Sequence, residues 1–240
     1  DRLANLDTRA VHVDPRNADI LIAAMSGSGI VEKNLATVYR STDGGDTWTP
    51  RNEDLPANEP FFNENFWLYR GAEITADASG ALFAVNNAKK KIHHRPPSEN
   101  SRWKSVALPP PPLPPPAPRY LIAAADTARV GRFYVAFAGQ SLWRTDNVGA
   151  SWTQLYNGNI VSFALDRTRA NQLALTSHEG ILVSADAGAT WRNLDAANAL
   201  PYRPANHVLP LGDRVLAATS ANGVFWKKIN NNQNNRTIPR

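Results

Sequence analysis

Short runs of alternating apolar and polar residues recur along the 240-residue chain, separated by turn-forming residues. In the first group, AVHV (10–13) is followed by ILIAAM (20–25) and TVYR (37–40), with Gly, Asn, Asp or Ser between the runs. Alternation over four to eight residues is typical of half-buried β-strands, and little of the chain shows the 3.6-residue period of amphipathic helices. The pattern therefore predicts an all-β protein of short antiparallel strands.

An eight-residue pattern, called the octet here, follows the third strand in three of these groups. The octets are STDGGDTW (41–48), TDNVGASW (145–152) and SADAGATW (184–191), and all fit S/T-x-D/N-x-G-x-S/T-W. Because the spacing and the flanking strands repeat together, the octets mark one repeated structural unit. The octet residues expected to be structural are Ser41, Asp43, Gly45, Thr47 and Trp48, then Thr145, Asn147, Gly149, Ser151 and Trp152, and finally Ser184, Asp186, Gly188, Thr190 and Trp191.

The residue types of the octet suit a closed turn. The Asp or Asn accepts hydrogen bonds from backbone N–H groups of its own turn, the Gly permits a positive φ, and the hydroxyls cap other polar groups. The Trp is expected to bury its ring between neighbouring strands, so replacing Trp48 or Trp191 by Ala should cost about 3–5 kcal/mol. We interpret the octet as scaffold rather than as a catalytic or metal site at Asp43 or Asp186.

A four-strand unit with a period of about 40–55 residues can be traced five times around the octets, which is the spacing of propeller blades. The second unit keeps Trp103 but has lost the Asp and the Gly, and the last has three clear strands. Its fourth strand could come from residues 1–7, which would close a ring, or from NRTIPR (235–240). The predicted units are residues 8–54, 70–108, 119–158, 159–196 and 205–240 of a single domain spanning 1–240, with a Pro-rich connection at 108–118.

The octet is the Asp-box pattern, and the chain resembles the Asp-box (BNR-repeat) β-propellers. The text VDPRNADILIAAMSGSG (13–29), followed by VYRSTDGGDTW (38–48), is similar to blades of photosystem II stability/assembly factors and of related bacterial extracytoplasmic propellers. Sialidases and sortilin are more distant members of the group. The resemblance implies a β-propeller of four-stranded antiparallel blades, five by our count. Asn147 departs from the family pattern, because it keeps an acceptor and loses the charge.

In such a propeller the octets lie on one face of the disc, and the binding loops are expected on the opposite face. The long segment between the first two units is rich in aromatic residues, and later loops of that face add polar ones. These aromatics either bind a partner or cover the blade ends and the central channel. The residues predicted to bind a ligand or partner are Phe62, Phe66, Trp67, Tyr69, Arg70, His178, Glu179, Tyr202 and Arg203, beside other polar loop residues that include Gln140 and Tyr156.

Charge and cysteine content narrow the choice of partner. The formal net charge is +5 and is spread along the chain, which favours an acidic or anionic protein or carbohydrate polymer and gives no reason to expect nucleic acid. The chain has no Cys, which excludes disulfides, thiolate nucleophiles and Cys-ligated zinc. No run of about eighteen apolar residues is present, so no membrane span is expected.

Signatures of common enzyme classes are missing from the sequence. There is no G-x-S-x-G, no H-E-x-x-H and no P-loop, and His93 and His94 should point to opposite faces of one strand. We therefore expect no cofactor, no metal and no catalytic residue. The prediction is a monomeric, non-catalytic scaffold that binds its partner through the face opposite the octets.

The alternative function is a glycoside hydrolase of the sialidase type. The resemblance would then require an arginine cluster for the substrate carboxylate, but the Arg-Ile-Pro motif of that family is not found. Because the first residue is Asp1 and not Met, we presume that a secretion signal has been removed. Together with the resemblance, this predicts a periplasmic or secreted protein.

Overall fold

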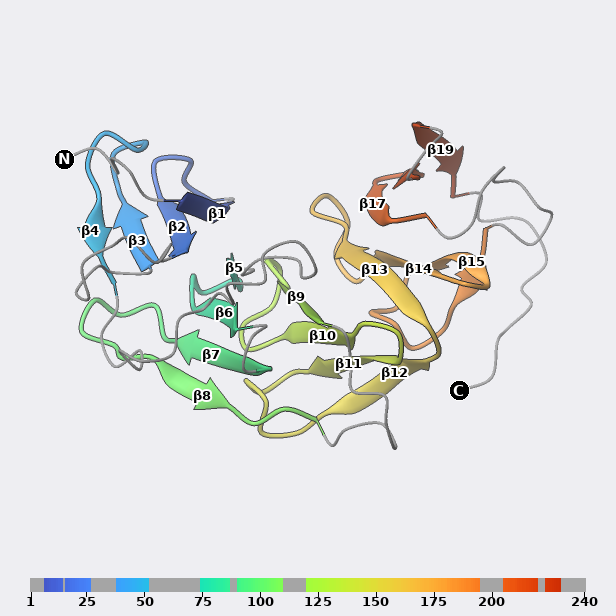
Figure 1. The fold of residues 1–240 in the computed structure, drawn as a ribbon, viewed down its shortest axis with the longest axis horizontal. Coiled ribbons are helices and arrows are strands. Elements are labelled where there is room, and N and C mark those ends of the chain that lie inside the picture. Colours follow the sequence, from blue (N-terminus) through green and yellow to red (C-terminus); the bar gives the residue numbers. More distant parts are fainter. Residues whose placement is uncertain are drawn as a thin grey trace. The chain divides into compact units, whose positions relative to one another are not determined.

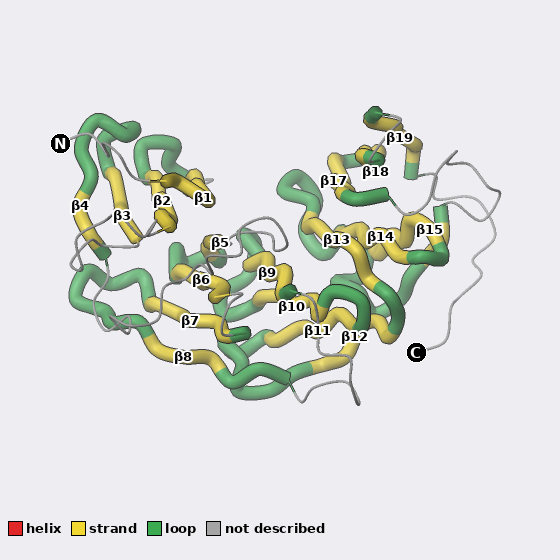
Figure 2. Tube along the Cα trace, in the orientation of Figure 1, coloured by secondary structure: helices red, strands yellow, loops and turns green. Residues whose placement is uncertain are grey.

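The computed structural model describes residues 7–14, 16–26, 38–51, 74–86, 90–109, 120–194, 205–219 and 223–229. These residues form nineteen β-strands and no helix (Figures 1 and 2), which confirms the predicted all-β class. Within these ranges there is accordingly no helix of the length and apolar character needed to cross a membrane.

The strands form five antiparallel sheets, and in each sheet the strands pair in chain order. Four sheets have four strands and the fifth has three among the described residues. The sheets are β1 (Asp7–Val13), β2 (Leu21–Ser26), β3 (Val38–Ser41) and β4 (Thr49–Pro50); β5 (Ile74–Ala76), β6 (Leu82–Asn86), β7 (Lys91–Arg95) and β8 (Lys104–Val106); β9 (Leu121–Ala125), β10 (Phe133–Phe137), β11 (Ser141–Thr145) and β12 (Thr153–Asn157); β13 (Ile160–Leu165), β14 (Leu173–Ser177), β15 (Gly180–Ser184) and β16 (Arg192–Asn193); and β17 (His207–Leu211), β18 (Arg214–Ala218) and β19 (Val224–Lys228).

The chain divides into two compact units. The first comprises Asp1–Pro111, Ala125–Phe133 and Thr145–Ser151, and the second comprises Pro112–Ala124, Tyr134–Arg144 and Trp152–Arg240. In the first unit, apolar residues of the first two sheets form one core. Its largest members are Ile22, Val38, Ile74, Leu82 and Trp103.

The second compact unit shows why the residues of some strands are apolar throughout and do not alternate with polar ones. All five residues of β14 are buried. Leu173 and Leu175 join a core shared with the third sheet, whereas Ala174 joins a core shared with the fifth. Because successive side chains of a strand point to opposite faces, β14 has neighbours on both faces and needs apolar residues on both.

The fifth sheet buries one face against the fourth sheet. Val208, Val215 and Ala217 belong to the shared core. The other face is exposed in the described part of the chain, where Leu209 is 47% and Trp226 60% exposed. This apolar face and the outer edge of β19 distinguish the fifth sheet from the fourth.

Candidate functional site

The first octet is closed by hydrogen bonds among its own residues. The Asp43 carboxylate accepts from the backbone N–H of Thr47 (2.9 Å), from the Thr47 hydroxyl (2.5 Å) and from the Ser41 hydroxyl (2.7 Å). Ser41 Oγ in turn accepts from the N–H of Gly45 (2.9 Å). These donors, Thr47 first, hold the pKa of Asp43 well below its usual value.

The other two octets repeat this arrangement. Asp186 accepts from the N–H (2.9 Å) and the hydroxyl (2.6 Å) of Thr190. Asn147 Oδ1 likewise accepts from the N–H of Ser151 (2.8 Å), but its side-chain amide donates to the Ser151 hydroxyl (2.9 Å). In the Asp186 octet the Thr190 hydroxyl donates to the carboxylate, whereas here the Asn147 amide donates to the Ser151 hydroxyl. The hydrogen bond is reversed in direction, and the turn stays closed.

The fourth residue of each octet has a positive φ, which the sequence pattern does not reveal. Its N–H donates to a carbonyl in the first turn of the same sheet, and this bond holds the two turns side by side. Val148 adopts this conformation although it is β-branched, which is unusual. The residues and acceptors are Gly44 (φ 70°) to Asp19 at 3.0 Å, Val148 (56°) to Gly131 at 3.0 Å, and Ala187 (59°) to Asn171 at 2.8 Å.

The tryptophans differ more than their sequence positions suggest. Trp191 is buried, as is Trp103 in the second sheet, which lacks an octet. By contrast, Trp48 is half-exposed, and its indole N–H donates to Gly45 O of its own turn (2.9 Å). The expectation of a ring buried between strands therefore describes Trp191 and not Trp48.

A second recurring carboxylate, which we did not predict, lies at the end of the first strand in four sheets. Each one is buried and accepts the N–H of the residue two positions later, which forms an Asx turn. The sequence signal is an Asp directly after an apolar strand. The pairs are Asp14–Arg16 (2.9 Å), Asp77–Ser79 (2.8 Å), Asp126–Ala128 (2.9 Å) and Asp166–Thr168 (2.7 Å).

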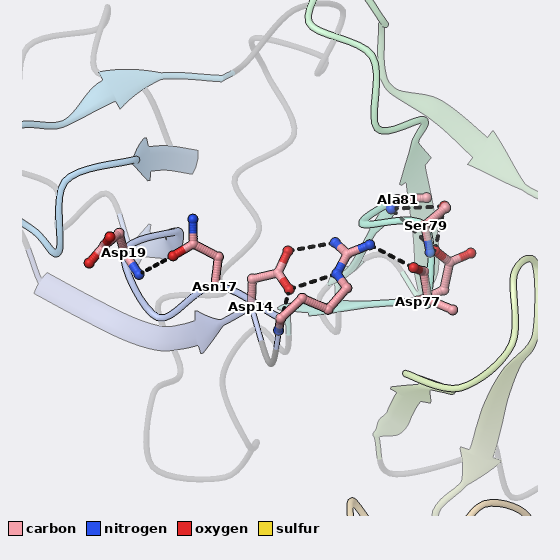
Figure 3. A network of polar contacts seen from close by, with 8 residues as sticks. Asp14, Asn17, Asp19, Asp77, Ser79 and Ala81 are labelled. Atoms are coloured by element: carbon pink, nitrogen blue, oxygen red, sulfur yellow. Dashed lines mark hydrogen bonds and ion pairs between the residues drawn. The ribbon is translucent and has the colours of Figure 1, made fainter.

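Asp14 connects the first sheet to the second through Arg16. The guanidinium donates to both carboxylate oxygens, at 2.9 and 2.6 Å, and its other terminal nitrogen donates to the carbonyl of Ala78 (2.6 Å). Figure 3 shows Asp14 of the first sheet and, across from it, the turn that contains Asp77 and Ser79. The Arg16 hydrogen bond lowers the pKa of Asp14.

Asp77 and Asp166 connect successive sheets directly. The second oxygen of Asp77 accepts from the N–H of Gly131 (2.7 Å), 54 residues later. The second carboxylate oxygen of Asp166 accepts from Gly212 N–H (2.7 Å) and from the Gln172 amide (2.6 Å). The carboxylates at this end of the strands are thus used for turns and for contacts between sheets.

The candidate binding site of the second compact unit is the β14–β15 turn. This turn lies at the end of β15 opposite the octet. His178 and Glu179 are exposed there. The turn is held in place because Glu179 N–H donates to Ser177 Oγ (3.1 Å) and Glu179 O accepts from Asn193 Nδ2 (2.9 Å). The two predicted residues therefore project from a fixed backbone.

Tyr156 of β12 lies beneath this turn. Its ring contacts that of Trp191 edge to face, with centroids 6.3 Å apart. Its buried hydroxyl lies beside Ser177 and Glu179 but meets neither at full hydrogen-bonding geometry. Burial raises the pKa of Tyr156, and Glu179 raises it further, against the opposing effect of Ser177. The structure thus brings Tyr156 beneath the turn that carries His178 and Glu179.

In the first compact unit, the corresponding connection of the second sheet joins β6 to β7. Lys90 in this turn has a positive φ of 53° and is half-buried. Burial lowers the pKa of its ammonium group.

The remaining predicted site residues lie outside the described residues. They are Phe62, Phe66, Trp67, Tyr69, Arg70, Tyr202 and Arg203. The same is true of residues 1–6 and of residues 110–118 of the Pro-rich connection. Within the described ranges no group of three or more His, Asp or Glu side chains is arranged to hold a metal ion.

Comparison with known proteins identifies the fold. No family model matches the chain, and no curated protein does. Among solved structures, YCF48 from Cyanidioschyzon merolae has a TM-score of 0.60 at 14% identity, covering 97% of this chain and 70% of that one. The extracellular domain of a putative hybrid two component system from B. thetaiotaomicron has a TM-score of 0.59 at 14% identity, covering 95% and 28%. The chain is a β-propeller of about five blades.

This propeller also resembles an enzyme. An ancestral GH74 enzyme has a TM-score of 0.54 at 14% identity, and the likeness covers 97% of this chain and 31% of that one. The chain therefore spans about a third of the length of that enzyme. At this identity the similarities to solved structures show the fold, which hosts binding proteins and enzymes alike.

Proposed function

We propose that this propeller is a non-catalytic scaffold that binds a protein or polymer through the face opposite the octets. The observation that carries the proposal is the exposed pair His178–Glu179 on a turn fixed by Ser177 and Asn193. A rigid backbone that presents exposed polar side chains lowers the entropy cost of binding. We expect the buried Tyr156 to support the turn from below.

The octet side of the sheets is a poorer candidate. The carboxylates of Asp43 and Asp186 each accept several hydrogen bonds within their turns. Asp77 and Asp166 are used between sheets. Side chains already used in this way have little capacity left for a partner.

A solved relative in fold supports a protein partner. A structure described as YCF48 bound to D1 peptide has a TM-score of 0.57 at 14% identity, covering 95% of this chain and 65% of that one. We propose an assembly-factor-like role of this kind, with an acidic partner suggested by the net charge of +5. The likeness to an extracellular domain supports a periplasmic or secreted location.

The test is recovery of a partner with the immobilised chain. His178→Ala with Glu179→Ala should reduce the recovered partner at least tenfold, as should Phe66→Ala with Trp67→Ala. Asp46→Ala, which removes an exposed carboxylate of the first octet, is the matched control and should leave recovery unchanged. A partner retained by both double variants and lost with Asp46→Ala would reverse the assignment of the binding face.

The second candidate is a glycoside hydrolase of the sialidase type, which the fold of the GH74 enzyme makes worth testing. Hydrolysis of a fluorogenic sialoside by the purified chain, lost on Arg203→Ala, would replace the scaffold proposal. We expect no hydrolysis above that of a heat-denatured sample.

A further inference from the structure

The second and fourth sheets pack against the sheets that precede them through the same two positions of the first strand. These positions lie one and three residues before the Asp that follows this strand. In the second sheet they are Ala76 and Ile74, which are buried in the core shared with the first sheet. In the fourth sheet they are Leu165 and Phe163, which pack in the core shared with the third sheet. Because alternate residues of a strand share one side of the sheet, these positions mark one face, called the preceding face here.

The same two positions of the first sheet are exposed. The Asp that follows β1 is Asp14, so the positions are Val13 and Val11, which are 43% and 56% exposed. Two branched apolar side chains at positions that are buried in other sheets indicate a face suited to packing.

Trp48 belongs to this preceding face. Trp103 and Trp191, which also stand directly before the fourth strands of their sheets, donate their indole N–H groups to a backbone carbonyl of the preceding sheet, at 2.7 and 2.9 Å. Trp48 is half-exposed, and its indole N–H donates within its own turn, to Gly45 O. The residue type that joins two sheets elsewhere is therefore present on the first sheet as well, on a face that is open to contact.

The fifth sheet presents the opposite kind of face, called the following face here. In the fourth sheet this face carries Ile181 and Val183 of β15, which are buried in the core shared with the fifth sheet. Val224 and Trp226 of β19 alternate in the same way but are 66% and 60% exposed. Strand pairing places two residues of β17 on the same face, Leu209 at 47% and Leu211 at 49% exposure.

Trp226 is held in place on the following face by Arg214. The guanidinium carbon lies 4.8 Å from the centre of the ring, which is a cation–π contact. Trp and Arg are the residue types that most often dominate the binding energy of protein interfaces. A ring that is already held in position loses little conformational entropy when a partner covers it.

We propose that the following face of the fifth sheet in one copy of the chain packs against the preceding face of the first sheet in a second copy. The internal interfaces identify this occupant. The core between the first and second sheets and the core between the fourth and fifth sheets each join one following face to one preceding face. The chain exposes one face of each kind, so two copies bury both kinds in a single contact.

This contact is heterologous, because different surfaces of the two copies meet. Each assembly keeps one following face and one preceding face open at its ends, so further copies can add. The chain then associates with itself, in place of the monomer expected from the sequence. The β14–β15 turn takes no part in this contact, so self-association and partner binding can be tested separately.

Sedimentation velocity over about a hundredfold range of concentration tests the association, because mass action favours assembly at high concentration. The unchanged chain should form dimers and longer assemblies as the concentration rises. Val11→Asp and Trp226→Asp each place a charge on one of the two faces, so each variant alone should associate about tenfold more weakly or less. A chain that stays monomeric at every concentration would overturn the proposal.

Val130→Asp is the matched control. Val130 is 68% exposed, but it lies in the turn between β9 and β10 and on neither of the two faces. This variant should associate like the unchanged chain. If it weakens association as much as Val11→Asp does, added charge alone explains the result and the assigned faces are wrong.

Mixing the two variants tests the head-to-tail arrangement. The Val11→Asp copy retains its following face, and the Trp226→Asp copy retains its preceding face. An equimolar mixture should therefore form a dimer that contains one copy of each and grows no further. If the copies met through like faces, one variant would still dimerise alone and mixing would restore nothing, and either result would contradict the proposal.

Amide hydrogen exchange of β14 reports whether each variant remains folded, because all five residues of this strand are buried. Val13→Asp and Leu209→Asp provide a second variant for each face, at side chains that are 43% and 47% exposed. They should weaken association in the same way while β14 stays protected. Unchanged association of both, with β14 protected, would also overturn the proposal.

Discussion

Trp191 donates its indole N–H to the backbone carbonyl of Leu155, 36 residues earlier in the chain, at 2.9 Å. Trp103 makes the same contact with Arg51 O at 2.7 Å. Both rings are buried, so each combines apolar burial with a hydrogen bond to the preceding sheet. This relationship makes the tryptophan a contact between blades as well as part of a turn.

Replacing Trp191 by Ala should lower the free energy of unfolding by about 3–5 kcal/mol, because it opens a cavity between sheets. Trp191→Phe keeps most of the ring and should cost about 1–2 kcal/mol, because Leu155 O loses its donor. Trp48→Ala should cost less than Trp191→Ala, because Trp48 is half-exposed. Urea denaturation of the three variants checks this order, and equal costs for the two Ala variants would contradict it.

Gly188 and Gly223 form a matched pair for separating strain from steric overlap. Both have positive φ, 88° and 83°, but a Cβ at Gly188 would lie 2.6 Å from Leu155 Cδ1, whereas one at Gly223 would meet nothing within 4 Å. Gly223→Ala should cost about 1–2 kcal/mol from backbone strain. Gly188→Ala should cost about 1–3 kcal/mol more, because Leu155 must move. Thermal unfolding of both variants measures the difference.

Stability should decrease in acid because of the carboxylates in the first turns. Hydrogen bonds hold the pKa of Asp14 below its usual value, with Arg16 as the main cause. At Asp166, burial opposes the shift, but hydrogen bonds from Thr168, Gly212 and Arg169 outweigh it and lower the pKa. A lowered pKa in the folded state stabilises the fold above the unfolded pKa of about 3.9, and this stabilisation is lost as the pH falls through the folded value.

Denaturant unfolding between pH 7 and pH 2 checks this expectation. The unfolding free energy should fall below about pH 4, and the fall should be smaller in Asp14→Asn and Asp166→Asn. Asp46→Asn removes an exposed carboxylate and is the control. If the control flattens the profile as much as Asp166→Asn does, the buried carboxylates are not responsible.

Tyr156 should ionise late in an alkaline titration. Burial first, and then Glu179, raise the pKa of its hydroxyl in the folded state. A raised folded pKa gives stability that is present below the unfolded pKa of about 10 and is lost as the pH rises through the folded value. Absorbance near 295 nm should therefore show a late-ionising tyrosine component that is smaller by one tyrosine in Tyr156→Phe. Disappearance of an early-titrating tyrosine instead would contradict the assignment.

The sequence alone determined the parts of this protein that depend on neighbouring residues. Alternating residues predicted the strands, and the octet pattern predicted the turn in which Ser41, Asp43 and Thr47 bond to one another. These contacts lie within four residues, so chain geometry suffices to form them. The repeat of that local unit was enough to predict five sheets.

Only the tertiary structure decided which groups meet across sheets. Asp77 contacts Gly131 54 residues away, and Tyr156 lies beneath the turn that carries Glu179, yet no local pattern joins these residues. The full burial of Trp191 and the only partial burial of Trp48, at the same position of two octets, likewise depend on what packs against each ring. Such contacts arise from the packing of whole sheets, because a side chain's partner is set by the neighbouring blade and not by its own turn.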